Sequence, residues 1–180
     1  ATLVWMLPVC LALGREGTAL NRIGRYTVVT PEVIADIELA SSQMPDNPRT
    51  AFQLGENLRR LSFEGGDQWQ ELAVKAIEAL ERAARLNPYD AHVQLALGQT
   101  YRWLNDPEKA DAAFQKAYLL GPNDMHIAGT LAWYALQQGQ LDDARRLATL
   151  SLEWQWWSND LAREVLLQVE QQSKAPPPTP

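Results

Sequence analysis

The chain has 180 residues, of which 46% are hydrophobic, and this is enough for one domain with a substantial core. Its formal net charge of -6 argues against nucleic acid or an anionic membrane surface as the main partner, because both attract basic surfaces. A single cysteine, Cys10, excludes an internal disulfide.

Residues 1–29 form an N-terminal segment that begins with an unusually apolar stretch. Of its first 13 residues, 11 are apolar, and only Thr2 and Pro8 interrupt them. The stretch is shorter than the roughly 20 residues of a membrane span, and no basic region precedes it as in a signal peptide. Two interpretations stay open: the end of a membrane helix, or an assembly segment that docks on another protein chain. The side chains of this assembly segment are Leu3, Val4, Trp5, Met6, Leu7, Val9 and Leu11.

A single helix is predicted from Pro31 to Met44. Thr30 supplies its N-cap, Pro31 suits its first position, and Glu32 places an acid at the positive end of the helix dipole. An apolar pattern with helical spacing follows, at Val33, Ile34, Ile37, Leu39 and Ala40.

A helix pair is predicted over residues 48–88. Gly55 lies in its first helix and Ala76 in its second, and 21 residues separate them, whereas 12 residues separate Gly98 from Ala110 in the next pair. We expect the extra residues, about nine, to form a loop around residues 62–67 at the turn edge of the pair.

The clearest pattern in the chain is a 34-residue period that opens after Asp90 and restarts at Met125. Asp106 starts the second helix of this period as an N-cap, and Gly121 with Pro122 ends it. Seven positions carry the pattern: Leu97, Gly98, Tyr101, Ala110, Phe114, Ala117 and Pro122. The next copy keeps Leu131, a turn glycine at Gly139, and Ala144.

The C-terminal part of the chain has the pattern of a helix that caps the repeat stack. Asp160 is predicted to cap a last helix from Leu161 to about Gln172, with Val165, Leu166 and Val169 facing inward. Residues 174–180 form a proline-rich tail, which leaves residues 30–173 as the helical domain. Trp154, Trp156 and Trp157 crowd the turn before the last helix, and we expect some of them to form an aromatic interface, because tryptophan is enriched in binding surfaces.

Residues 48–158 resemble the tetratricopeptide repeat (TPR) superfamily at these seven positions. The resemblance implies an all-α fold: a right-handed stack of about three helix pairs, with a half unit before it and a capping helix after it. It also implies that the partner is a protein. Residues 86–91 and 97–104 further resemble the TPR region that follows the membrane part of bacterial O-antigen ligase-like glycan polymerases, which implies that the repeats lie outside the membrane.

In TPR proteins the first helix of each pair lines a protein-binding groove. The resemblance therefore assigns this groove to twelve positions: Phe52, Glu56, Arg59, Arg60, Leu95, Gln99, Arg102, Trp103, Gly129, Trp133, Leu136 and Gln137. Lysines and asparagines that hold a carboxylate in the chaperone-binding subgroup are absent from these positions, so chaperone binding is not expected.

The sequence contains no motif with the residue spacing that catalysis, cofactor binding or metal binding requires. We expect His92 and His126 to be surface residues. We therefore expect a non-enzymatic scaffold without a cofactor. The leading hypothesis is head-to-tail self-assembly into an oligomer or extracellular filament through the apolar N-terminal segment. The alternative is a membrane-anchored extracytoplasmic adaptor domain of an envelope glycan-assembly protein. Both hypotheses place the chain outside the cytoplasm.

Overall fold

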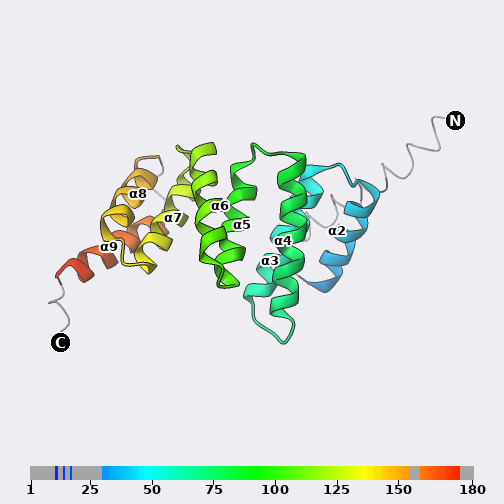
Figure 1. The fold of residues 1–180 in the computed structure, drawn as a ribbon, viewed down its shortest axis with the longest axis horizontal. Helices are drawn as coiled ribbons and strands as arrows, with labels where there is room; N and C mark the ends of the chain where they lie inside the picture. Colours follow the sequence, from blue (N-terminus) through cyan, green and yellow to red (C-terminus); the bar gives the residue numbers. More distant parts are fainter. Residues whose placement is uncertain (1–10, 12–13, 15–16, 18–29, 155–158, 175–180) are drawn as a thin grey trace. The chain divides into compact units, whose positions relative to one another are not determined.

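The computed structural model describes residues 11, 14, 17, 30–154 and 159–174. From residue 30 onward, these described residues form eight α-helices and no strand, which confirms the all-α repeat prediction (Figure 1). Most of the predicted assembly segment lies outside the described residues, and its last member, Leu11, is half-exposed.

The chain packs as two compact units, Ala1–Ala113 (unit 1) and Phe114–Pro180 (unit 2). The prediction of one helical domain over residues 30–173 stays a prediction. Unit 1 holds α2 (Pro31–Gln43), α3 (Pro48–Phe63), α4 (Trp69–Leu86) and α5 (Ala91–Trp103). The helix α6 (Pro107–Leu120) spans the boundary, and unit 2 continues with α7 (Met125–Gln137), α8 (Leu141–Trp154) and α9 (Asp160–Lys174).

Side-chain caps set most of the helix starts. Thr30 caps α2 and Asn47 caps α3, where its Oδ1 accepts from the Arg49 N–H at 2.9 Å. Asp90 and Asp124 lie one period apart, and each accepts from two N–H groups in the first turn of its helix. These short-range bonds satisfy amide groups that a helix start leaves unpaired, so the sequence alone locates the helix starts well.

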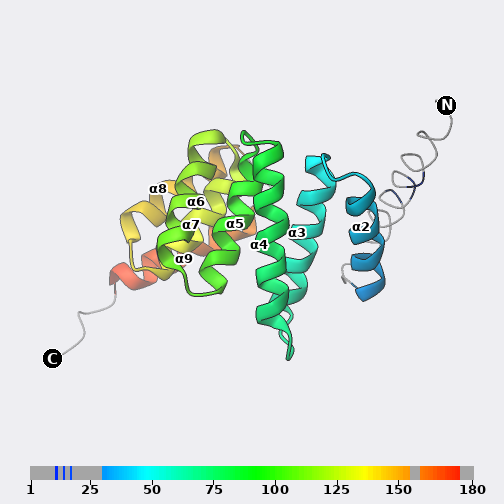
Figure 2. The same ribbon diagram turned by 45° about the vertical axis from the view of Figure 1, so that its right-hand side comes forward.

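The expected loop at residues 62–67 is wrong in its extent. The extra residues mainly lengthen the two helices, so α3 has 16 residues and α4 has 18, compared with 13 in α5 and 14 in α6. Only residues 64–68 connect them (Figure 2). Leu61 and Leu72 explain the extension, because both pack partly buried against the core and thereby continue the helical period past the usual turn.

Gly55 marks the closest approach of α3 and α4. A Cβ atom at this position would lie 2.6 Å from Leu80 Cγ and 3.1 Å from the Ala76 carbonyl oxygen. Because glycine has no side chain, α3 and α4 can approach each other this closely at Gly55. Around this crossing, the core of unit 1 includes Ala51, Leu58, Ala76, Leu80, Ala83, Val93, Ala96 and Leu97.

The short turns that follow α5 and α7 each contain a left-handed residue. Asn105 has φ of 61° after α5, and Gly139, one period later, has φ of 74° after α7. The residue that follows each of them returns an N–H bond to the end of the preceding helix, from Asp106 to Tyr101 at 2.9 Å and from Gln140 to Ala135 at 2.9 Å. Asparagine tolerates this conformation better than most residues with a side chain, so it can replace the glycine.

The last helix, α9, packs against the core of unit 2. Val165 and Val169 are fully buried in the core, and Leu166 packs partly buried beside it, as the inward pattern predicts. The predicted N-cap, Asp160, is wrong by one residue. The helix α9 begins at Asp160, and the cap is Asn159, whose side chain accepts from the Ala162 N–H at 3.2 Å. Asn159 also donates to Ser151 Oγ at 2.8 Å, which ties the start of α9 to α8.

Candidate functional site

An aromatic cluster of Phe63, Trp69 and Trp103 lies where α3 ends, α4 begins and α5 ends. The Trp103 ring centroid is 4.8 Å from that of Phe63, with the rings tilted at 54°, and 5.3 Å from that of Trp69, edge to face at 66°. Such geometries are the favoured ones for aromatic pairs. Phe63 remains 39% exposed and Trp103 41%, so the cluster offers aromatic surface to a partner.

A charged group adjoins this aromatic cluster. Arg59 donates to both carboxylate oxygens of Glu56, at 2.8 and 2.7 Å, and its guanidinium lies 4.9 Å from the centroid of the Phe63 ring. Two interactions therefore hold the Arg59 side chain, which is only 11% exposed. Arg60 reaches the same carboxylate at 3.5 Å but is 54% exposed, so it stays accessible to a ligand.

The structure brings together four of the predicted groove residues in unit 1: Glu56, Arg59, Arg60 and Trp103. It does so through Phe63, which the sequence analysis missed together with Trp69. The available signal was the continuation of the apolar helical pattern beyond Leu58, which would have carried α3 as far as Phe63.

The other predicted groove residues differ in exposure. Leu95 and Leu136 are buried at 2% and 3% exposure, so they contribute to the core and offer no surface to a partner. Phe52 and Trp133 pack partly buried against the cores of their own units. Gly129 is also buried, and a Cβ atom there would lie 3.1 Å from Ser151 Oγ.

Three polar groove positions keep some surface, since Gln99 and Arg102 are half-buried and Gln137 is exposed. In the predicted aromatic interface, Trp154 is 54% exposed, while Trp156 and Trp157 lie outside the described residues.

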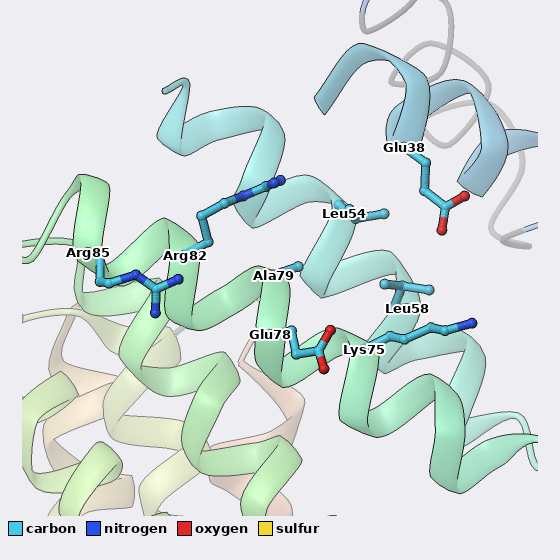
Figure 3. A pocket seen from close by; sticks show the side chains of 8 residues that line it. All are labelled: Glu38, Leu54, Leu58, Lys75, Glu78, Ala79, Arg82 and Arg85. Carbon is cyan, nitrogen blue, oxygen red and sulfur yellow. The ribbon is translucent and has the colours of Figure 1, made fainter. Parts of the chain in front are cut away.

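A second candidate site is a pocket of about 240 Å³ between α2 and α4, which we call the charged pocket. Figure 3 shows two leucines of α3, Leu54 and Leu58, between a residue of α2, Glu38, and a row of side chains on α4. The α4 residues that line the pocket are Lys75, Glu78, Ala79, Arg82 and Arg85. The sequence analysis assigned none of these residues to a site.

Within the described residues, no group of three or more histidine, cysteine or acidic side chains is placed to bind a metal ion. His92 and His126 are both exposed. Among the helices of this part of the chain, none has the length and apolar character that crossing a bilayer requires.

The family model of the tetratricopeptide repeat matches residues 91–124. The chain carries a TPR. This match covers the segment with the clearest 34-residue period, and TPR proteins are in general scaffolds for protein binding without catalytic activity. The further resemblance to O-antigen ligase-like proteins stays a prediction, and no curated protein matches this chain in sequence.

Solved structures with TPR folds are similar to the chain over most of its length. A thermophilic TPR protein of Thermus thermophilus has a TM-score of 0.76 at 23% identity, over 87% of this chain and 80% of that protein. A structure of MamA protein has a TM-score of 0.62 at 17% identity, over 93% of this chain and 87% of that one. A second MamA structure has a TM-score of 0.57 at 17% identity, over 79% of this chain and 90% of that one. At these identities the similarity establishes the fold alone.

Proposed function

We propose that this chain is a non-enzymatic TPR scaffold that binds a second copy of itself. The observation that carries the proposal is the aromatic cluster, in which Phe63 and Trp103 expose ring surface beside a fixed arginine. Tryptophan and arginine supply a large share of the binding energy in protein interfaces. Glu56 compensates the charge of Arg59, so the exposed surface is mainly aromatic, which suits an apolar chain segment better than a small polar metabolite.

The occupant that we propose for the aromatic cluster is the apolar N-terminal stretch, residues 1–13, of another copy. Its side chains are large and apolar, and in water they require cover from a membrane or another protein surface. An extended stretch of this length spans roughly 40 Å, which exceeds the length of any helix in unit 1. Because donor and acceptor surfaces differ, the contact is head-to-tail and yields rings or filaments.

Light scattering coupled to gel filtration tests this proposal. The full chain is expected to form large assemblies, and the chain that lacks residues 1–14 is expected to be a folded monomer. Trp103→Ala should weaken assembly about thirty-fold or more, since truncating a central interface tryptophan costs about 2 kcal/mol or more. Tyr89→Ala is the matched control, because Tyr89 is 80% exposed and lies outside the aromatic cluster. Undiminished assembly after the deletion would overturn the proposal.

The alternative proposal is an extracytoplasmic TPR adaptor that an N-terminal apolar helix anchors to the membrane. The same apolar stretch favours it. It predicts a monomer that binds lipid vesicles through residues 1–14 and that Trp103→Ala leaves unchanged. A vesicle flotation assay with the full and truncated chains separates the two proposals.

A further inference from the structure

The charged pocket has an apolar floor and two ends of opposite charge. Leu58 is buried at 3% exposure and Ala79 at 6%, and Leu54 lies beside them partly buried. In Figure 3, the Arg82 side chain extends away from α4 at one end of this floor, whereas Lys75 extends along the other end toward Glu38.

At the basic end, two arginines lie three positions apart on α4, and no carboxylate of the described residues lies within ion-pair distance of either. Arg82 donates through Nη2 to Ser41 Oγ of α2, and its Nε is buried without a hydrogen-bond partner. Neither Arg82 nor Arg85 forms an ion pair with any described residue. Like charges at this spacing repel each other, so an anion at this end would be stabilised.

At the opposite end the excess charge is negative. Lys75 Nζ lies 2.8 Å from Glu71 Oε1, and the two charges compensate each other. The hydrogen bond that Lys75 donates to Glu71 raises the pKa of Lys75, and the nearby charges of Glu38 and Glu78 raise it further. These two glutamates form no ion pair or hydrogen bond with other described residues, which leaves two uncompensated carboxylates near Lys75.

The packing of the repeat does not require the charges of Glu78 and Arg85. One 34-residue period later, Ala112 occupies the position of Glu78 and Leu119 that of Arg85. Neutral residues are thus accepted at these two places in a helix of the same kind, whereas Lys109 and Lys116 keep a cation at the positions of Lys75 and Arg82. The charges of Glu78 and Arg85 therefore need another explanation, and recognition of a charged partner provides one.

We propose that the charged pocket binds a short extended segment of a partner protein, in which an acidic and a basic residue lie three positions apart with apolar residues between them. Lys75 and Arg82 are seven positions apart on α4, which corresponds to about 10 Å along the helix axis. Three residues of an extended chain span about the same distance.

Each part of such a segment has a counterpart in the charged pocket. Its carboxylate accepts charge-assisted hydrogen bonds from Arg82 and Arg85, and its apolar side chains pack on Leu54 and Leu58. Its cation lies between Glu38 and Glu78. The assignment goes beyond the proposed self-assembly, because it uses different residues and a different kind of occupant.

Saturation-transfer difference NMR on synthetic peptides tests the proposal, and it works for a monomer and for a large assembly alike. The probes are the acetylated and amidated peptides AELLKA and AKLLEA, which present the two charge orders, and the uncharged AQLLQA. One charged order is expected to bind with a dissociation constant of about 1 mM. Its leucine methyl groups should receive the strongest saturation, because they pack on the apolar floor.

Two exposed positions provide variants that keep the fold. Arg85→Gln and Glu38→Gln are each expected to weaken binding of that peptide at least five-fold, while Lys116→Gln, which removes a charge from an exposed position of α6, leaves it unchanged. Circular dichroism confirms that the variants fold. Absence of saturable binding by both charged peptides, equal binding of AQLLQA, or unchanged affinity in both pocket variants would overturn the proposal. None of these results depends on whether the chain assembles.

Discussion

Gly55→Ala is expected to destabilise unit 1, although helix propensity alone favours alanine. Alanine in a helix interior is more stable than glycine by about 1 kcal/mol. The added Cβ would lie 2.6 Å from Leu80 Cγ and 2.9 Å from Leu80 Cδ2, and Leu80 is fully buried. It would also lie 3.1 Å from the Ala76 carbonyl oxygen, which belongs to the backbone and cannot rotate away. Overpacking of this kind costs about 1–3 kcal/mol, and the gain in helix propensity offsets about 1 kcal/mol of it, so we expect a net loss of up to about 2 kcal/mol.

A double-mutant cycle with Leu80→Ala measures the contact directly. Leu80→Ala alone is expected to cost about 2–5 kcal/mol. It also removes the carbon atoms that the new Cβ meets first. The free energy of unfolding of the double variant should therefore exceed the value expected from adding the two single effects by at least about 1 kcal/mol. The assay is urea unfolding followed by circular dichroism, with the free energy of unfolding extrapolated to water.

Gly66→Ala is the matched control for this cycle. A Cβ atom at Gly66 meets nothing within 4 Å, so the free energy of unfolding should change by no more than about 0.5 kcal/mol. If Gly55→Ala stabilises the protein, or if its effect adds to that of Leu80→Ala without coupling, the close crossing of α3 and α4 is not what places glycine there.

Three further predictions concern single residues. Ser151→Ala removes two hydrogen bonds, one donated to the Met125 carbonyl and one accepted from Asn159, and should lower the free energy of unfolding by about 1–3 kcal/mol in a urea titration, whereas Thr149→Ala, at an exposed helix position, should change it by about 0.5 kcal/mol or less. Asn105→Ala places a side chain without a local hydrogen-bonding group at φ of 61° and should cost about 1 kcal/mol, measured by thermal melting. The hydrogen bond that Lys109 donates to the Asp106 carboxylate lowers the pKa of Asp106 from 3.8, so this aspartate stabilises the fold above that pH and loses the effect as the pH falls through the lowered pKa. Asp106→Asn should accordingly unfold with less dependence on acidic pH, and an unchanged pH profile would contradict the pairing.

The repeat and its helix boundaries could be predicted because they depend on local features. Asp106 and Pro107 begin α6 where the sequence places its start, and α6 ends at Leu120 before Gly121. Caps and breakers act on residues three or four positions away, so spacing alone reveals them. The inward positions of α9 were predicted for the same reason, since burial of Val165 follows from the helical period.

Features that depend on contacts between helices could not be predicted in this way. The aromatic cluster requires that α3 and α4 both extend past the usual turn, so that Phe63 and Trp69 reach Trp103. A 34-residue pattern carries no information on such an extension, because the extra residues have no counterpart in it. Leu95 illustrates the opposite error. Its repeat position predicts groove surface, whereas its exposed fraction of 2% places it in the core.

The two sites of unit 1 have opposite electrostatic characters, and this difference limits what each can bind. At the aromatic cluster, Glu56 already compensates the charge of Arg59, so aromatic surface dominates and favours an apolar occupant. At the charged pocket, Arg82 and Glu38 form no close ion pair within the described residues, so an occupant must bring charges of its own to offset their desolvation. Added salt therefore weakens binding at the charged pocket by screening, while an excluded salt such as sulfate strengthens apolar contacts at the aromatic cluster. Ionic strength thus distinguishes the two sites even when one partner protein carries both kinds of segment.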